Sequence, residues 1–382
     1  MKLARQRRTG LKVVLLCCVW YSISSTNNVI GKVVLTNLPF PLTVTIVHLG
    51  SIALYSGPVL ALSGVRPQLE MDWSTWARCI LPLVLGKFFT SLSSHISLWK
   101  VPVSYAHTVK ATMPLFTVIL SKMILGQSQT LTVYLSLLPI IFGVIIATVT
   151  EISFDMIGLI AALSSTIVFA LQNIYTKKVM RERGVHHLRL LHILARLALV
   201  TCLPFWLAWD APRLLRNREL TRHADLVTIV LLFVDGFLNF TQNLVAFTML
   251  NMLSPLTYSV CNAAKRICII SFSLLMLHNP VTGTNVFGMT LAILGVLLYN
   301  KAKQDARRLE QLPTHHSELI SGPVVGSTVT LNSNQSNGKP NGALPGTWQK
   351  TIAPPSSKPT NNILFEHIFA NNNTQYIPIV HS

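Results

Sequence analysis

The sequence predicts an all-α membrane protein: ten transmembrane helices arranged as two inverted five-helix repeats, followed by a disordered C-terminal tail. Three observations support this fold class, namely the composition, a series of long apolar runs and an internal repeat. Of the 382 residues, 51% are hydrophobic and only 12% are charged, whereas soluble proteins have about 25% charged residues. A chain of this composition is expected to lie in a lipid bilayer.

Apolar runs of about 20 residues, each long enough to cross about 30 Å of hydrocarbon, recur along the chain. Clusters of Pro, Gly and Asn separate several of them. The cysteines lie within these runs without metal-ligand spacing, so we expect no metal site and no cofactor. The ten predicted helices span residues 12–35, 41–63, 74–98, 102–125, 130–149, 155–179, 187–209, 225–250, 254–277 and 282–301.

The net charge of +18 is concentrated in three clusters, within residues 2–12, 177–189 and 301–308. An even number of crossings places all three on one side, which the positive-inside rule makes cytoplasmic. We therefore expect both termini in the cytoplasm and no binding of nucleic acid. One loop disagrees with this topology, because it puts four basic residues on the opposite side: Arg213, Arg216, Arg218 and Arg222.

An internal repeat divides the membrane region in two. PVSYA, beginning at Pro102, recurs as PLTYS, beginning at Pro255, and two further matches occur in the same order at a similar offset. These matches predict two five-helix units, at residues 12–149 and 150–302, after a basic N-terminus at 1–11. Five is odd, so the second unit enters the membrane from the opposite side, as in many secondary transporters. Residues 303–382 are rich in Ser, Asn, Pro and Gly and are predicted to be a disordered cytoplasmic tail.

Three cations are expected near the middle of the membrane. Lys110 lies about 12 Å into the fourth predicted helix, and Lys265 and Arg266 lie about 15 Å into the ninth, which enters from the other face. Each such charge costs roughly 2.5–3.5 kcal/mol on insertion scales. Asp235 is the only acid well inside a predicted span. We therefore interpret the cations as a site for an anion that the protein does not supply.

Charge alone leaves phosphate, sulfate, carboxylate and diphosphate open as ligands, with phosphate the natural first hypothesis. We expect Asp235 to pair with Arg196 on the preceding predicted helix. Acids are too scarce in the spans for a proton relay. Lys32 and Lys87 could either reach the membrane surface or line the cavity. Polar residues that could complete the cavity are His107, which shares a helix face with Lys110, and Tyr105, Tyr258, His95, Ser91, Ser94, Gln242, Asn243 and Asn262.

The stretches PVSYAHTVK (102–110) and PLTYSVCNAAKR (255–266) resemble the triose-phosphate translocator family of the drug/metabolite transporter superfamily. The resemblance covers roughly residues 12–302 and is closest to solute carrier family 35, subfamily E, whose members are mostly described as transporters of the secretory pathway. It implies ten helices in two inverted halves. It also implies kinship with plastid antiporters that exchange phosphate for phosphorylated C3, C5 or C6 compounds.

In those plastid members the phosphate is held by a lysine and a Lys-Arg pair, which match Lys110, Lys265 and Arg266 here. Other substrate contacts differ: the family's histidine and threonine in the third helix align with Ser91 and Ser94, and its eighth-helix tyrosine aligns with Gln242. The resemblance therefore implies a retained phosphate end and an altered end for the rest of the substrate.

These observations predict a secondary transporter, an antiporter that moves a phosphorylated or other anionic metabolite across a Golgi or ER membrane by alternating access. A nucleotide-sugar transporter and a non-transporting scaffold acting through the C-terminal tail are the alternatives. An enzyme is not expected, because the spans contain no nucleophile–base pair and no paired carboxylates. The partners are a small anionic solute and the bilayer. The oligomeric state and the identity of the substrate stay open.

Overall fold

A computed structural model describes residues 2–64, 72–126, 128–216, 226–253 and 255–310, and within these ranges every regular element is a helix. Residues 311–382 of the predicted tail, along with Arg218 and Arg222, lie outside the described residues, whereas residues 303–310 are helical, so the prediction of disorder is wrong there. The elements of the first predicted unit are α1 (Lys2–Asn37), α2 (Pro41–Leu62), α3 (Trp73–Lys100), α4 (Val103–Val109), η1 (Lys110–Thr112), α5 (Met113–Leu125), α6 (Leu131–Leu135) and α7 (Leu138–Val149). Those of the second are α8 (Met156–Arg183), α9 (His187–Arg216), α11 (Leu226–Met252), α12 (Pro255–Leu277) and α13 (Gly283–Glu310).

The membrane crossings agree with the predicted all-α fold. Nine segments of the described chain are helical, long and apolar enough to cross a bilayer, the short α6 and α7 together forming one of them. The remaining predicted crossing, residues 102–125, is divided into α4, η1 and α5 and so contains no single long helix. Counting this broken crossing, the described chain accommodates the ten predicted spans.

Several helices extend beyond the predicted ends. α8, α9 and α13 continue for four to nine residues and have basic side chains in their last turns, such as Arg183, Arg216 and Arg307. Positive charge in a last helical turn interacts favourably with the helix dipole, which explains why these basic segments are helical. Arg213 and Arg216 therefore lie on the end of α9, and the prediction that they belong to a loop is wrong.

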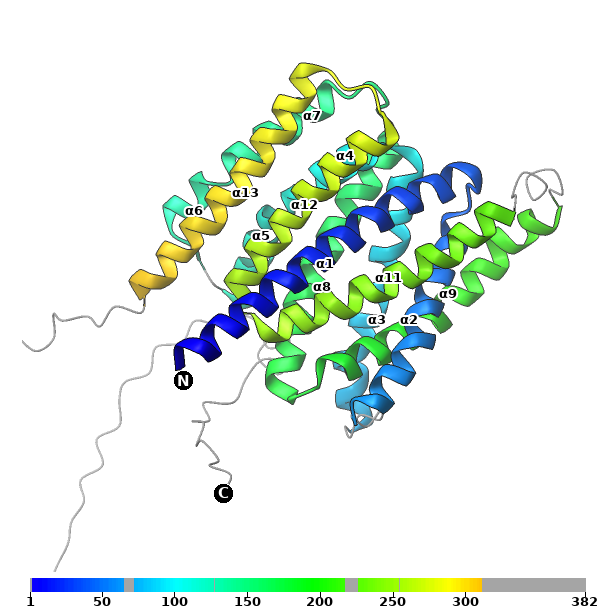
Figure 1. Cartoon of the computed structure of the whole chain (residues 1–382), viewed down its shortest axis with the longest axis horizontal. Coiled ribbons are helices and arrows are strands. Elements are labelled where there is room, and N and C mark those ends of the chain that lie inside the picture. The colour runs from blue at the N-terminus through cyan, green and yellow to red at the C-terminus, as the bar shows by residue number, and fades with distance from the viewer. Residues whose placement is uncertain (1, 65–71, 127, 217–225, 254, 311–382) are drawn as a thin grey trace, which may run out of the picture. The chain divides into compact units, whose positions relative to one another are not determined.

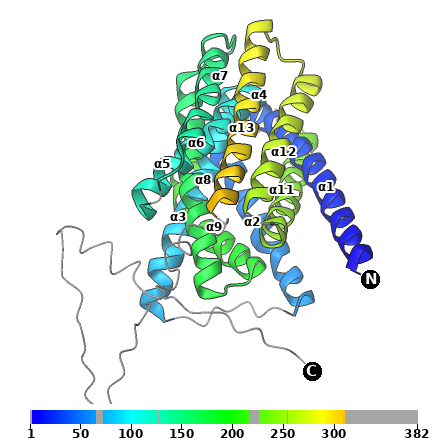
Figure 2. The ribbon, with the colours of Figure 1, turned by 90° about the vertical axis from the view of Figure 1, so that its left-hand side faces the viewer.

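Helices distant in sequence pack side by side (Figures 1 and 2). The principal pairs are α3 with α8, α7 with α13, α2 with α9 and α1 with α11. α7 and α13 approach closely, since a Cβ atom on Gly143 would overlap the backbone of Ala292 and one on Gly288 would overlap that of Ala147. Small residues replace large ones at such crossings because membrane helices gain stability from close packing.

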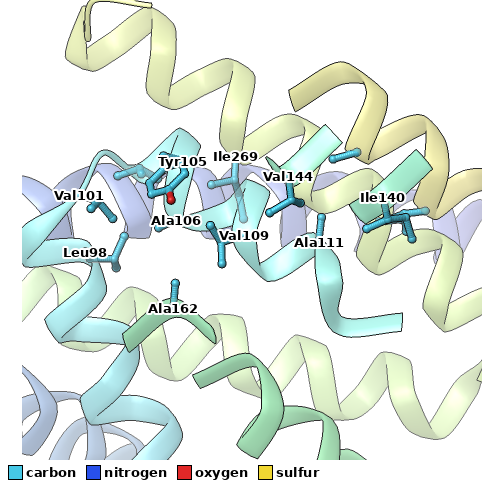
Figure 3. Packing of buried hydrophobic residues seen from close by; sticks show 14 of the residues in the cluster. Leu98, Val101, Tyr105, Ala106, Val109, Ala111, Ile140, Val144, Ala162 and Ile269 are labelled. Atoms are coloured by element: carbon cyan, nitrogen blue, oxygen red, sulfur yellow. The ribbon is translucent and has the colours of Figure 1, made fainter. Parts of the chain in front are cut away.

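One side of the broken crossing is packed by apolar residues. Figure 3 shows Tyr105 and Val109 of α4 among side chains of other helices, including Val144 of α7, Ala162 of α8 and Ile269 of α12. Val109 and Tyr105 are fully buried. This packing fixes the position at which α4 ends, and hence the position of Lys110.

Candidate functional site

A central cavity of about 240 Å³ lies among α1, α2, α3, α4, α8, α11 and α12. Polar side chains from all of these helices face it, including Asn28 of α1, Gln172 of α8 and Asn239 of α11. Seven of the eight predicted site residues line it: Ser91, Ser94, His107, Lys110, Gln242, Tyr258 and Lys265. The eighth, Arg266, lies in an adjoining space.

That adjoining space, of about 150 Å³, is here called the three-cation cavity, because Lys110, Lys265 and Arg266 all line it. Ser94 and His107 line both cavities, and Asn262 does so as well. Among the described residues, no Asp or Glu lines either cavity. The structure therefore brings the three predicted cations together beside a shared space and gives them no acidic partner there.

Each cation is held by a weak or partial contact. The Lys110 Nζ donates to Ser94 Oγ at 3.3 Å. The Lys265 Nζ lies 4.4 Å from the centre of the Trp20 ring, a cation–π contact. The Arg266 Nη2 donates to the thioether of Met113 at 3.4 Å, and its Nη1 is buried without a hydrogen-bond partner in the described chain. A buried guanidinium with an unused donor is costly, so this group is well suited to bind an added acceptor.

Pro114 explains why Lys110 sits at a break in its helix. A proline cannot donate to the carbonyl four residues earlier, which is that of Lys110, and its ring clashes with that carbonyl. The Lys110 carbonyl instead accepts from the Met113 N–H in the short turn η1. α5 then begins at Met113, and Met113 and Pro114 line a third space together with Arg266. The positive N-terminal end of α5 adds to the field of the cations.

The other predicted residues differ in whether they line the central cavity. His107 Nε2 donates to Asn28 Oδ1 at 2.9 Å, and Tyr258 stacks on Trp20 with ring centres 5.7 Å apart. The Gln242 side-chain oxygen is buried and has no hydrogen-bond partner in the described chain. Tyr105, in contrast, does not line the cavity: it is fully buried and donates to Thr148 Oγ1 at 3.2 Å.

The structure also resolves the two lysines that the sequence left open. Lys32 donates to three carbonyls at the end of α3: those of Leu98 at 2.8 Å, Trp99 at 3.2 Å and Val101 at 3.1 Å. Its role is to cap a helix end. Lys87, in contrast, lines the central cavity and donates to Asn243 Oδ1 at 3.1 Å.

The predicted pair between Arg196 and Asp235 is wrong. The Asp235 Oδ2 lies 2.6 Å from His48 Nε2, and its Oδ1 has no hydrogen-bond partner in the described residues. His48 in turn contacts His95, with Nδ1 and Nε2 3.1 Å apart. These contacts join one acid and two histidines, whereas the expectation about a proton relay considered acids alone.

The third space, here called the end cavity, lies beside the last turns of α8 and α13 and has a volume of about 140 Å³. Arg266, Asn262 and Tyr258 connect it to the other two cavities. Its outer wall is basic, comprising Lys177, Lys303 and Arg307. Lys303 donates to Tyr299 Oη at 3.0 Å.

Comparison with known proteins agrees with this architecture. A sequence model of the Triose-phosphate Transporter family matches residues 11–300. The chain belongs to this family. Among similar proteins, glucose-6-phosphate/phosphate translocator 1 of Arabidopsis thaliana, a chloroplastic protein, is 31% identical over 300 residues, which cover 77% of this chain and 76% of the relative.

Two further relatives are also chloroplastic. Phosphoenolpyruvate/phosphate translocator 3 of Oryza sativa subsp. japonica is 33% identical over 79% of this chain and 76% of its own. The triose phosphate/phosphate translocator of Spinacia oleracea is 30% identical over 78% of this chain and 74% of its own. Membership confirms the predictions of a multi-pass membrane transporter and of a chain that is not an enzyme.

Proposed function

We propose that this member of the Triose-phosphate Transporter family is an antiporter that binds the phosphate group of its substrate with Lys110, Lys265 and Arg266. The observation that carries the proposal is that these three cations line one cavity in which no described acid faces them. The names of the relatives support the substrate class, because each exchanges a phosphorylated compound for phosphate.

The energetics favour an anion at this point. A unit charge pair about 4 Å apart contributes roughly 4 kcal/mol at an effective dielectric constant of about 20. Arg266 can offer two parallel N–H donors to two phosphate oxygens, whereas Lys110 and Lys265 act as point charges. Gln242, whose side-chain oxygen has no hydrogen-bond partner in the described chain, lines the central cavity together with Ser91 and Ser94. We assign them to the remainder of the substrate.

Obligatory exchange follows from the same charges. Closing a cavity around unneutralised cations removes them from water, which is unfavourable, whereas an anion-loaded cavity can close at a smaller cost. The reorientation step is therefore expected to require bound anion in both directions.

Uptake of radiolabelled phosphate into proteoliposomes tests the proposal. Liposomes preloaded with phosphate should take up label at least about tenfold faster than empty ones. Arg266→Lys should lower kcat/KM by about 10- to 100-fold, because the ammonium keeps the charge but loses the fork. Lys122→Gln is the control, since Lys122 lies in the last turn of α5 and lines none of the three cavities.

Equal uptake with and without internal phosphate would contradict obligatory exchange. A response to nucleoside monophosphates and nucleotide sugars, without one to phosphate or sugar phosphates, would favour a nucleotide-sugar transporter instead.

The arrangement as two inverted halves, residues 12–149 and 150–302, is part of the proposal. Helix contacts support it, because exchanging the halves converts the pair α3–α8 into α11–α1 and the pair α2–α3 into α9–α11, all of which are in contact. The pairs α2–α9 and α7–α13 map onto themselves. Substrate sites at such repeat interfaces lie near the middle of the membrane.

We also place the protein in the Golgi or ER membrane with both termini in the cytoplasm. The basic clusters support the orientation, and the resemblance to solute carrier family 35, subfamily E, supports the compartment. Protease protection of a terminal tag in sealed microsomes, together with imaging against Golgi and ER markers, tests both statements. If the protease degraded neither terminal tag, both termini would lie in the lumen and the proposed orientation would be wrong.

A further inference from the structure

Four side chains from α2, α3 and α11 form a continuous buried chain next to the central cavity. Asp235 Oδ2 lies 2.6 Å from His48 Nε2, His48 Nδ1 lies 3.1 Å from His95 Nε2, and His95 Nδ1 lies 2.7 Å from Thr45 Oγ1. All four side chains are at least nine-tenths buried, and Asp235 is fully buried. Both histidines line the cavity, whereas Asp235 lies behind them.

The last contact fixes the direction of the chain. Thr45 Oγ1 donates its single hydrogen to the carbonyl of Pro41 at 2.7 Å, so it must accept from His95 Nδ1. The contact from His95 to His48 and the contact from His48 to Asp235 then each need one hydrogen between the two heavy atoms. Three hydrogens are therefore shared by two imidazoles and one carboxyl.

A neutral histidine carries one ring hydrogen and an ionised carboxylate carries none. With both histidines neutral and Asp235 ionised, only two hydrogens would be present, and one of the three contacts would be unmade. The fully bonded chain thus holds one additional proton, whether it resides on Asp235, His48 or His95. In that form the net charge of these three groups is zero, and it becomes −1 when the proton leaves.

The groups that face this chain would make proton loss depend on the occupant of the cavity. α1 and α8 present uncharged residues there, and α9, which packs on α2, carries His192, bonded to Ser56, and Arg196. The titratable groups that face the chain across the cavity are Lys87 of α3, His107 of α4, Lys110 of η1, and Tyr258 and Lys265 of α12. An anion among these cations repels a negatively charged chain and so favours the protonated one.

We propose that Asp235, His48 and His95 form a proton-binding site that is loaded together with the anion in the central cavity. The inference rests on the proposed function, because it needs an anion to bind beside Lys110 and Lys265. By linkage, the anion raises proton occupancy and the proton raises anion affinity by the same factor. The proton comes from water in the cavity, which both histidines line, and is shared along the hydrogen bonds that join His95, His48 and Asp235.

Calorimetric titration of the purified full-length protein with inorganic phosphate, in buffers of different ionisation enthalpy, tests this linkage. For each phosphate bound, the wild type should take up as much as one proton more than Asp235→Asn does. As the chain loses its proton with rising pH, the Kd of the wild type for phosphate should also rise more steeply than that of Asp235→Asn, by as much as tenfold per pH unit. Protonation of phosphate itself contributes equally to both proteins and cancels in the difference. His95→Gln should behave like Asp235→Asn.

Asp210→Asn is the matched control, since Asp210 is a buried acid bonded to Thr43 and lines none of the cavities. His192→Gln serves the same purpose for His95. Both should retain the wild-type proton uptake. The proposal is overturned if Asp235→Asn and the wild type take up the same number of protons, which would make the chain only a structural link between helices.

A second readout does not depend on phosphate. Loss of the proton removes one hydrogen bond, so the Tm of the wild type should fall as the pH rises through the titration of the chain, and that of Asp235→Asn should not. If phosphate did not bind but the Tm of the wild type showed this pH dependence, the proposal of an anion site would be wrong and the proton-binding site would stand. If the Tm depended on pH in the same way in both proteins, the proposal of a proton-binding site would be wrong, and the proposal of an anion site would be unaffected.

Discussion

Half-buried lysines in this protein differ in role because they differ in partners. Lys32 donates to three backbone carbonyls at the end of α3, which already carry partial negative charge. Lys110 has one weak contact, to a serine hydroxyl at 3.3 Å. A charge satisfied by the backbone stabilises the fold, whereas a charge beside a cavity with little to neutralise it is available to a ligand.

We therefore expect loss of the Lys32 charge to affect stability more than phosphate binding. Lys32→Met should lower the Tm of the purified protein, by an amount that corresponds to roughly 1–3 kcal/mol, because three carbonyls lose their donor. The KM for phosphate at a permissive temperature should stay within about twofold of the wild type. Thermal unfolding and exchange assays check the two parts.

Lys12→Met is the control for removing a lysine from α1, since Lys12 is exposed. If Lys32→Met left the Tm unchanged while raising KM severalfold, Lys32 would belong to the binding site and its capping role would be secondary.

Sequence could predict the three cations but not the other charged contacts. Lys110, Lys265 and Arg266 were identifiable because depth in a helix follows from residue count, and the structure places all three beside one cavity. Partners of Asp235 could not be predicted in the same way. The pairing with His48 depends on how α2 and α11 rotate about their axes, which the spacing of residues within each helix does not determine.

At the scale of elements, two glycines allow the close contact between α7 and α13. Gly143 of α7 and Gly288 of α13 face each other's helices, and a Cβ at either position would overlap the backbone opposite. Backbone atoms cannot move aside as a flexible side chain can. The pair therefore holds together the last crossing of each proposed half.

Gly143→Ala should consequently destabilise the protein even though alanine favours a helix. Overpacking costs typically about 1–3 kcal/mol, which exceeds the gain of roughly 1 kcal/mol from helix propensity. Gly50→Ala in α2 is the matched control, because nothing lies within 4 Å of the added Cβ, and it should leave the Tm unchanged or raise it. Thermal unfolding of the three proteins decides the comparison, and an unchanged Tm in Gly143→Ala would show that α7 and α13 separate freely.

Element boundaries were largely predictable, and the exceptions have local causes. Apolar length located every crossing within a few residues, except where basic residues extend a helix past the apolar run, as at Arg216. The break at Lys110 was signalled by Pro114, since the residue four before a proline loses its helical bond. Hydrophobicity alone did not reveal it, because both sides of the break are apolar.

For the molecule as a whole, the distribution of charge connects binding with the exchange cycle. The central cavity holds Lys87 in addition to Lys110 and Lys265, and Arg266 lies in the adjoining three-cation cavity. Two unit charges about 10 Å apart repel by about 1–2 kcal/mol at an effective dielectric constant of about 20. Each cation thus adds to the cost of closing the carrier without an anion.

Lys87 offers a way to change this cost while keeping the proposed phosphate ligands. It lines the central cavity but not the three-cation cavity, and it donates to Asn243. Lys87→Gln keeps a donor for that contact and removes one charge. We expect phosphate uptake into empty liposomes to rise about tenfold relative to uptake into preloaded ones, because about 1–2 kcal/mol of repulsion is relieved in the unloaded carrier alone.

Lys122→Gln should leave the ratio unchanged, since Lys122 lines none of the cavities. If Lys87→Gln slowed both uptakes equally, repulsion among cations would not be what makes exchange obligatory, and the coupling would have to arise from contacts that the substrate makes on closure.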